Sequence, residues 1–433
     1  MMRLLLALLL LTLPAQAMDI VEVTSPGGTR IWLVEEESIP IVSVELHFAS
    51  GARLDPDDQL GATALMTGLL EEGSGDLDAQ AFARARETIA ARFGFDSGQD
   101  GVTISASMLA ENRTETIDLL ATALSQPRFD PSAVERVRAQ LLSNISAAER
   151  DPDRIAGRAF IGALFPDHVY ARPRNGTEAT VSALTVDTLR AARARALTRD
   201  RVTVSVVGDI GPEDAGRMID RLLGALPATG PALPPRATVS AGGPDIVIPF
   251  DVPQSIAIFG HEGLDRDDPD FIPAFVASTI VGGGGFGSRL GEEIREKRGL
   301  TYGIYASLSP RDLGALYLGS VSSANDRIGD VVDLVRAEWA RAAATGVTAE
   351  ELAQAKRYLT GAYALRFASN GRIADGLVGL QLADLPIDYV NIRNDLIEAV
   401  TLDEVNRVAA RLFKPDALRF VIVGQPTGLV PTE

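Results

Sequence analysis

The stretch VSALTVDTLRAARARALTRDRVTVSVVGDI, residues 181–210, returns later in the chain as IEAVTLDEVNRVAARLFKPDALRFVIVGQP, residues 397–426. In both copies a threonine that can cap a helix precedes an apolar helical stripe, a short turn and a β-branched run that ends at glycine. The repeat therefore predicts two copies of one helix–turn–strand unit. Matching positions keep one offset of 216 residues: Thr185 with Thr401, Asp187 with Asp403, Arg195 with Arg411, Asp200 with Asp416, and Val207-Gly208 with Val423-Gly424.

A second, weaker correspondence extends the repeat over most of the chain. Residues 39–70 and residues 253–283 each read as an alternating strand, an Asp/Pro turn and an apolar helix. A chain of 433 residues with 46% hydrophobic content is also too long for one compact core. We expect an α+β fold with two domains, residues 18–225 and 245–433, joined by a linker at 226–244 that is rich in Pro, Gly, Ala and Ser.

The first 17 residues, MMRLLLALLLLTLPAQA, have the pattern of a secretory signal peptide. Arg3 precedes an apolar run, and Ala15-Gln16-Ala17 offers a small-residue cleavage site. The run is short for a bilayer span, although a retained anchor is the alternative, and no later segment is long and apolar enough to be one. The excess of Arg over Lys and the many alanines suggest a GC-rich bacterium. We therefore expect an exported, periplasmic chain with no membrane span after cleavage.

Composition also limits the partners and sites that the chain can have. The formal net charge is −17, which argues against nucleic acid as a partner because like charges repel the phosphate backbone. No cysteine is present, so disulfides, thiolate metal sites and a cysteine nucleophile are excluded. On net charge alone, basic peptides would be favoured as ligands.

The segment SRLGEEIREKRGLTYG, residues 288–303, has the character of a functional site. Ser288 can cap a helix, Arg295 falls in its last turn, and Gly299 supplies a left-handed stop. Tyr302 then alternates in an expected strand, so its hydroxyl and the Arg295 guanidinium could converge on one point. The simpler interpretation is a solvated basic helix end followed by a tyrosine in the core.

Other candidate patterns are better explained by structure than by chemistry. The segment GGGGFGSR, residues 282–289, lacks the ending of a P-loop and is interpreted as a flexible helix connection. The acidic turn LDRDDPD, residues 264–270, lacks the later Gly and Glu of a calcium loop and is interpreted as a solvated turn. Isolated side chains with expected structural roles are the histidines His47 (strand), His168 (loop) and His261 (after a strand), and the surface carboxylates Glu71 and Glu72.

The stretch IVGGGGFGSRLGEEIREKRGLTYGIYASLSP, residues 280–310, resembles the second-half signature of the pitrilysin or insulinase-like zinc peptidases, which include the mitochondrial processing peptidase subunits. The resemblance extends over essentially the whole chain after residue 17. It implies two duplicated α/β-sandwich halves, each an antiparallel sheet with helices, that close like a clamshell over an extended peptide. It also implies that Arg295 and Tyr302 hold the substrate and stabilise its tetrahedral intermediate.

The zinc-binding half of this resemblance is missing. Active members carry H-x-x-E-H, in which two His bind zinc and the Glu activates water. In the aligned segment GATALMTGLLEEGS, residues 61–74, Ala64 and Gly68 stand at the His positions and Thr67 at the Glu position. The third family ligand, a Glu, would fall near Ser143 and Asn144. We therefore expect no metal and no other cofactor on this chain.

A chain with an Arg/Tyr pair and no zinc ligands suggests one half of a divided active site. The leading interpretation is a non-zinc-binding subunit of a periplasmic heterodimeric zinc peptidase, which contributes Arg295 and Tyr302 in trans to a homologous partner that carries H-x-x-E-H and the zinc. The substrate would be an extended peptide, paired with an exposed strand edge. The alternatives are a catalytically inert scaffold and a peptide-binding clamp that acts alone. Hinge closure about residues 226–244 is a further expectation.

Overall fold

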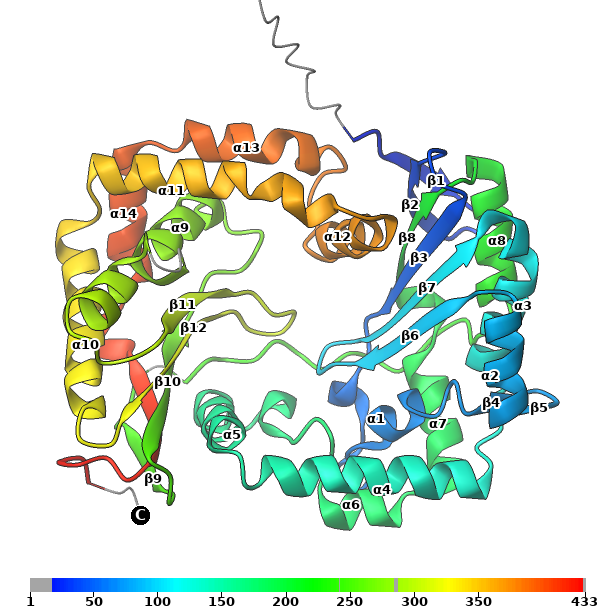
Figure 1. Cartoon of the computed structure of the whole chain (residues 1–433), viewed down its shortest axis with the longest axis horizontal. Helices are drawn as coiled ribbons and strands as arrows, with labels where there is room; N and C mark the ends of the chain where they lie inside the picture. The colour runs from blue at the N-terminus through cyan, green and yellow to red at the C-terminus, as the bar shows by residue number, and fades with distance from the viewer. Residues whose placement is uncertain (1–17, 241, 284–286, 431–433) are drawn as a thin grey trace, which may run out of the picture.

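The structure is a computed structural model that describes residues 18–240, 242–283 and 287–430. The predicted signal peptide, residues 1–17, and residues 284–286 of the glycine-rich segment lie outside the described residues. Two β-sheets stand on opposite sides of an open ring, and helices complete the ring between them (Figure 1). No helix in the described part of the chain is both long and apolar enough to cross a membrane.

The first sheet has six strands in the order β1-β2-β8-β3-β7-β6, and a separate small ladder joins β4 to β5. Its strands and the helices of this half span the following residues: β1 Val21–Thr24, β2 Arg30–Glu35, β3 Ile41–Phe48, α1 Ala62–Thr67, β4 Gly73–Ser74, β5 Leu77–Asp78, α2 Ala79–Thr88, β6 Arg92–Ser97, β7 Val102–Leu109, α3 Arg113–Ser125, α4 Pro131–Ala148, α5 Pro152–Leu164, α6 Glu178–Ala183, α7 Val186–Ala196, β8 Val202–Gly208 and α8 Pro212–Leu223.

The second sheet has five strands in the order β11-β12-β10-β13-β9. The elements of this half are β9 Ile246–Pro249, β10 Gln254–Glu262, α9 Phe271–Ser278, β11 Ile304–Ser309, β12 Leu316–Ala324, α10 Ile328–Thr345, α11 Ala349–Gly361, α12 Asn370–Leu382, α13 Tyr389–Ala399, α14 Leu402–Leu412 and β13 Arg419–Gly424, with π-helical turns at Thr279–Gly283 and Gly291–Glu296.

The predicted repeat is present in both halves at the same offset. Thr185 and Thr401 each begin a helix with a reciprocal capping box, which satisfies backbone donors at the helix start. Gly208 and Gly424 end the two repeated strands with φ of 141° and 154°. A Cβ at Gly208 would lie 2.1 Å from the Ile41 carbonyl oxygen, so only glycine fits there. The predicted α+β fold with duplicated halves is confirmed.

Both sheets are mixed rather than purely antiparallel. β8 runs antiparallel to β3 and parallel to β2, and β13 runs antiparallel to β10 and parallel to β9. The remaining pairings in each sheet are antiparallel. On the outer face of each sheet, helices bury one apolar stripe at helical spacing; in α14 this stripe is Val405, Val408, Ala409 and Leu412.

The inner face of each sheet is covered by a helix from the other half (Figure 1). Phe160 and Leu164 of α5 are fully buried in a cluster with Val421 and Val423 of the second sheet. Reciprocally, α12 packs on the first sheet, where Ser205 Oγ donates to the Ala374 carbonyl oxygen at 2.6 Å. Residues 18–225 and 245–433 thus hold one complete sheet each, but neither range holds a complete sandwich.

The turn between β11 and β12 also joins the halves. Arg53 of the first half is buried and pairs with Asp312 of this turn at 3.0 Å and with Asp100 at 3.3 Å. Tyr170 donates its hydroxyl hydrogen to Asp100 at 2.8 Å and accepts from the Leu313 backbone N–H at 2.9 Å. These contacts fix the second half against the first near the centre of the ring.

The predicted linker has no regular secondary structure among its described residues, but it is not a free tether. The Ala237 N–H donates to the Leu313 carbonyl oxygen at 2.6 Å, and the Ser240 N–H donates to the Leu164 carbonyl oxygen at 2.8 Å. Ala237 also packs against the apolar cluster around α5. The segment is therefore tied to both halves, and hinge closure about it stays a prediction.

Candidate functional site

The segment around Arg295 forms the predicted helix start and stop. Ser288 Oγ accepts a hydrogen bond from the Gly291 N–H at 3.2 Å. At the other end, Gly299 has φ of 61° and donates to the Arg295 carbonyl oxygen, while the Leu300 N–H reaches back to the Ile294 carbonyl oxygen. The bond from Gly299 is that of a helix that ends on a left-handed glycine. It places Arg295 on the last turn, where its side chain is half-buried.

Neighbouring cations of this turn are tied to one carboxylate. Lys297 Nζ lies 2.6 Å from Glu293, and Arg298 lies 2.7 Å from the same group. Hydrogen bonds from Lys297 and Arg298 lower the pKa of Glu293. The basic helix end is expected to be solvated. In the structure, Lys297 and Arg298 form a local ion-pair network with Glu293.

Tyr302 is 91% exposed and lies on a bend, two residues before β11 begins at Ile304. The prediction that Tyr302 sits in a strand is therefore wrong, and so is the simpler interpretation of a core tyrosine. Thr301 explains the difference, because its hydroxyl donates to the Ser322 carbonyl oxygen of β12 at 2.7 Å and holds the chain before the strand starts. With almost no packing, the Tyr302 side chain adds little to the stability of the isolated chain through burial.

Arg295 and Tyr302 thus belong to one continuous helix end and bend at the start of β11. Their shared role on a ligand stays a prediction. Among the described strands, β11 pairs with β12 alone and β6 pairs with β7 alone, so each leaves one edge of its sheet open. β1 and β9 are likewise paired on one side only. Pairing of an extended peptide with one of these strand edges stays a prediction.

In the first half, the positions at which the zinc motif would stand lie together on one helix. Ala64, Thr67 and Gly68 lie on α1 and at its end, as the alignment requires. A Cβ at Gly68 would lie 3.1 Å from Val137 of α4, so a side chain at this position faces the helix that carries Ser143 and Asn144. Within the described ranges, no group of three or more metal-ligating side chains is close enough to hold an ion.

Glu71 and Glu72, just after α1, are engaged in ion pairs. Glu71 pairs with Arg86 at 2.6 Å, and Glu72 pairs with Arg136 of α4. The interpretation of both residues as surface charges fits these contacts.

The three histidines have structural partners. His47 Nδ1 lies 3.0 Å from Thr103 Oγ1, and His168 Nε2 lies 3.0 Å from the Pro235 carbonyl oxygen. His261 lies inside β10 rather than after a strand, and its Nε2 accepts from the Trp339 indole N–H at 3.0 Å. Burial lowers the pKa of His261 to about 4, so the ring is neutral at pH 7.

The acidic turn at 264–270 is partly exposed, as its interpretation as a solvated turn expects, and some of its acids also form ion pairs. Asp268 pairs with Arg411 at 2.6 Å, and Asp270 pairs with Arg407 at 2.7 Å. Hydrogen bonding to Arg407 lowers the pKa of Asp270 to about 2. The sequence repeat could have indicated this contact. Arg195 is the counterpart of Arg411 in the first half, and it lies 3.7 Å from Asp55.

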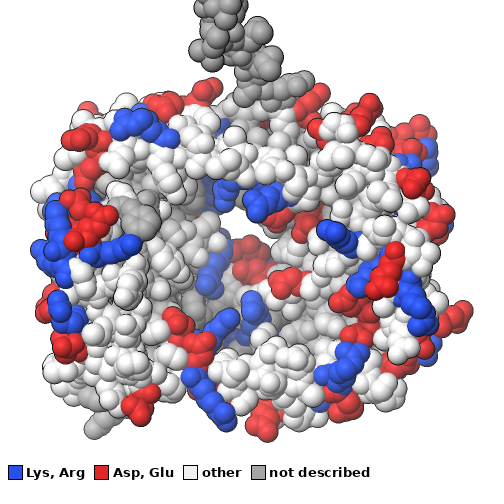
Figure 2. Space-filling model, in the orientation of Figure 1, with Lys and Arg blue, Asp and Glu red and all other residues white. Residues whose placement is uncertain are grey.

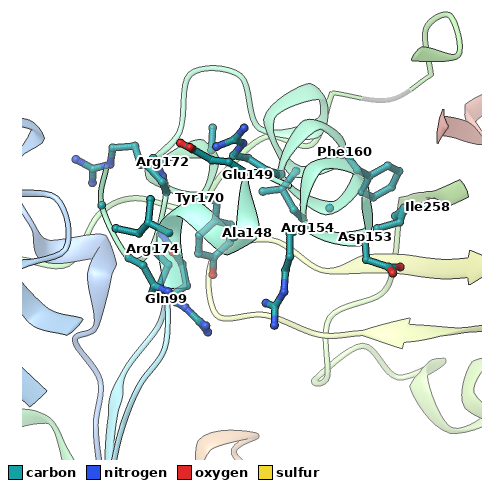
Figure 3. Close-up of a pocket in the computed structure, with 18 of the residues that line it drawn as sticks. Gln99, Ala148, Glu149, Asp153, Arg154, Phe160, Tyr170, Arg172, Arg174 and Ile258 are labelled. Atoms are coloured by element: carbon teal, nitrogen blue, oxygen red, sulfur yellow. The ribbon is translucent and has the colours of Figure 1, made fainter. Parts of the chain in front are cut away.

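Sequence reasoning missed a pocket between the two halves. The space-filling view shows a central opening with Lys and Arg side chains gathered around it, together with some Asp and Glu (Figure 2). A cavity of about 510 Å³ lies between the halves. It is bordered by α5 and by the turn around Arg172 (Figure 3). Five arginines line this cavity: Arg154, Arg158, Arg172, Arg174 and Arg311. Four of them lie within residues 154–174, and Arg311 comes from the other half, so the sequence shows the arginines of one wall but not the pocket that they border.

Two family profiles match the chain in succession. The profile described as "Insulinase (Peptidase family M16)" matches residues 30–178, and the profile described as "Peptidase M16 inactive domain" matches residues 183–359. The chain belongs to the M16 peptidase family. The resemblance seen in residues 280–310 is thereby confirmed, and the second profile includes Arg295 and Tyr302.

Relatives of this M16 chain match about nine-tenths of its length or more. It is 26% identical to the "Non-peptidase homolog YmxG" of Helicobacter pylori over 90% of each chain. It is 27% identical to an uncharacterized zinc protease of Mycobacterium leprae over 92% of this chain and 90% of that one. The crystal structure of a peptidase M16 inactive domain from Pseudomonas fluorescens superimposes with a TM-score of 0.88 at 27% identity, covering 96% of this chain and 100% of the other. This chain is an M16 homologue without the zinc motif.

Proposed function

We propose that this chain is the non-zinc-binding subunit of a heterodimeric zinc peptidase, exported to the periplasm, and that it contributes Arg295 and Tyr302 to a site completed by a homologous partner. The observation that carries the proposal is Tyr302: the side chain is 91% exposed on a bend held by Thr301. A tyrosine that buries almost nothing in the isolated chain is free to contact a ligand or a partner, and it follows directly on the helix end that bears Arg295.

The chemistry of peptide hydrolysis explains why a partner is required. A peptide carbonyl must be polarised and a water activated, and family members do both with a zinc ion and a glutamate. Positions 64, 67 and 68 of this chain hold Ala, Thr and Gly, which can do neither. A phenol and a guanidinium can still donate hydrogen bonds to the oxyanion that forms when water attacks. The zinc and glutamate of the partner and the phenol and guanidinium of this chain would therefore complement each other.

The second half would therefore face the zinc-bearing first half of the partner, with the extended peptide between them. An interface of this kind needs roughly 1,000 Å² or more of buried surface to hold register. A similar-length exported protein that carries H-x-x-E-H and is encoded beside this chain is the partner to test.

The first test uses this chain, the candidate partner and their mixture against a quenched fluorescent peptide. We expect cleavage by the mixture and none by this chain alone. Tyr302→Phe and Arg295→Ala should each lower turnover of the mixture by about 10²–10³, the usual cost of losing one oxyanion donor. Zinc content should stay unchanged, because the metal belongs to the other chain.

Matched controls separate this role from general surface effects. Tyr305→Phe removes the hydroxyl of another exposed tyrosine three positions along the chain, and Arg298→Ala removes a cation from the same helix end. Both should leave turnover within about twofold, as expected for surface substitutions. Full activity from the partner alone, or an unchanged rate with Tyr302→Phe and Arg295→Ala, would falsify the shared site.

The second candidate is a peptide-binding clamp that acts without cleavage. It is supported by the cavity of about 510 Å³ between the halves, which exists without any partner. Peptide binding by the isolated chain together with no activity in any mixture would favour the clamp. A mixture that assembles but neither binds nor cleaves peptide would favour an inert scaffold.

A further inference from the structure

The cavity between the halves has walls from both repeats. On one side are α5, the end of α4 and residues 170–177. On the other side are Ile258 of β10, Leu318 of β12 and Arg311 of the β11–β12 turn. The exchange of α5 onto the second sheet creates this pocket, because it brings the start of that helix beside strands of the other half (Figure 3).

The floor of the pocket is apolar. Phe160 is fully buried, and Ile258 and Leu318 pack against the same cluster. A Cβ at Gly157 would lie 3.6 Å from Ile258 Cδ1, so α5 rests directly on the strand. An apolar floor strengthens the binding of a ligand that carries apolar side chains. It adds no binding free energy for a small inorganic ion.

The rim of the pocket is basic and largely uncompensated. Arg154, Arg158 and Arg174 are exposed and form no ion pair or side-chain hydrogen bond with any residue in the described ranges. Arg172 differs, because Asp57 holds it at 2.7 Å. Asp153 lies near enough to Arg154 for their charges to interact, but the two side chains point in different directions (Figure 3). Two acids, Glu149 and Asp153, share the lining with five arginines, in a chain whose net charge is −17.

We propose that this pocket binds an acidic segment of a polypeptide. Carboxylates of the ligand meet Arg154, Arg158 and Arg174, and a neighbouring apolar side chain enters the floor beside Phe160. Guanidinium groups suit this task because they donate paired hydrogen bonds to carboxylates and lose less solvation than ammonium groups. The inference deepens the proposed function by naming a substrate class, and it rests on that function only in taking a peptide as the ligand.

The net charge of the whole chain does not oppose this assignment. At physiological salt a charge is screened beyond about 8 Å, so a ligand inside the pocket experiences the nearby arginines more than the distant acidic surface. The preference for basic peptides suggested by composition has no support from the lining of this pocket.

The test measures peptide binding to the isolated chain by fluorescence anisotropy. The probe is a short fluorescein-labelled peptide in which Glu alternates with Leu, and matched peptides carry Gln or Lys at the Glu positions. We expect the Glu peptide to bind at least about tenfold more tightly than the Gln peptide, which is a difference of about 1.4 kcal/mol. The double variant Arg154→Gln/Arg158→Gln should remove that advantage and leave binding of the Gln peptide nearly unchanged.

A matched control is the double variant Arg84→Gln/Arg199→Gln, which makes the same change in net charge at exposed sites outside the pocket. It should change the affinity for the Glu peptide by less than about twofold. Glu149→Gln should tighten binding of the Glu peptide, because it removes a like charge from the lining. Thermal unfolding checks that each variant is folded, and Arg174→Gln, on a loop, gives a second measurement if the helix variant is not.

Equal binding of the three peptides would overturn the proposal, and so would an unchanged affinity in the folded arginine variants. If inorganic phosphate displaces the Glu peptide at millimolar concentration, and replacing Leu with Ser costs no affinity, the pocket is a simple anion site and the peptide assignment is wrong. No partner and no cleavage enter this experiment. Failure of the shared zinc site would therefore leave a positive binding result intact, and failure of binding would leave the Tyr302 result intact.

Discussion

The inner faces of the two sheets come from one repeat but have different chemistry. Ser43 and Glu45 of β3 lie opposite Val207 and Ser205, and the matching positions of the second sheet are Ile256 and Ile258, opposite Val423 and Val421. The first face combines apolar residues with buried polar groups and lies under α12, whereas the second is apolar and lies under α5. Duplication thus preserved the backbone register of the strands, while each exchanged helix meets a different surface.

This difference predicts two kinds of contact between the halves. The contact through α5 is stabilised mainly by burial of apolar area. The contact through α12 includes apolar packing around Trp32 and Leu377, but also buried polar groups such as Glu45 and the Ser205 hydroxyl. Buried polar groups stabilise only when they are satisfied, so we expect α12 to be the more easily released of the two helices.

The largest effect is expected at the apolar contact. Phe160→Ala should lower the free energy of unfolding by about 3–5 kcal/mol, because the ring is fully buried between α5 and the second sheet and its loss leaves a cavity. Denaturant unfolding measures the change. Leu365→Ala is the control, since that side chain is 72% exposed and should cost no more than about 0.5 kcal/mol. A loss below about 1 kcal/mol for Phe160→Ala would mean that α5 does not carry this interface.

A pH-dependent effect is expected at the polar contact. Burial, with a smaller contribution from Asp375, raises the pKa of Glu45 from 4.5 to about 8. The folded state then holds a proton that the unfolded state releases above about pH 4.5, so the stability of the wild type should fall as the pH rises from about 4.5 to 8. Glu45→Gln mimics the protonated acid and should be more stable than the wild type at pH 8 by about 2–4 kcal/mol, with little difference at pH 4.5.

Unfolding curves across this pH range give the measurement for Glu45. Glu37→Gln, which removes an exposed carboxylate just before β3, is the control for the loss of one negative charge. Parallel curves for Glu45→Gln and the wild type would show that Glu45 is ionised in the folded chain, and the polar contact would then not respond to pH.

Local features of this fold could be predicted from the sequence because they depend on a few neighbouring residues. The threonine caps at 185 and 401 and the glycine stop at 299 are examples, and each appears where the pattern indicated. The missing zinc ligands could be identified for the same reason, since H-x-x-E-H is a short motif on one helix.

Features formed between distant segments could not be predicted in this way. An amphipathic helix shows which of its faces is buried, but not which sheet buries it, so the exchange of α5 and α12 left no local signal. The arginine pocket depends on that exchange and was missed with it. Tyr302 was misplaced because alternation favoured a strand, whereas the hydrogen bond from Thr301 to Ser322 delays the strand to Ile304.

The smallest effect is expected at the hydrogen bond between Ser205 and α12. The hydroxyl is buried and lies 2.6 Å from the Ala374 carbonyl oxygen, so Ser205→Ala should lower stability by about 1 kcal/mol. Glu45 lies opposite Ser205 in the sheet, and neighbouring polar groups couple. The cost of Ser205→Ala should therefore differ between the wild type and the Glu45→Gln background at pH 8. Equal costs in both backgrounds would mean that the two groups act independently, and the polar face would then be a set of separate contacts rather than one pH-sensitive surface.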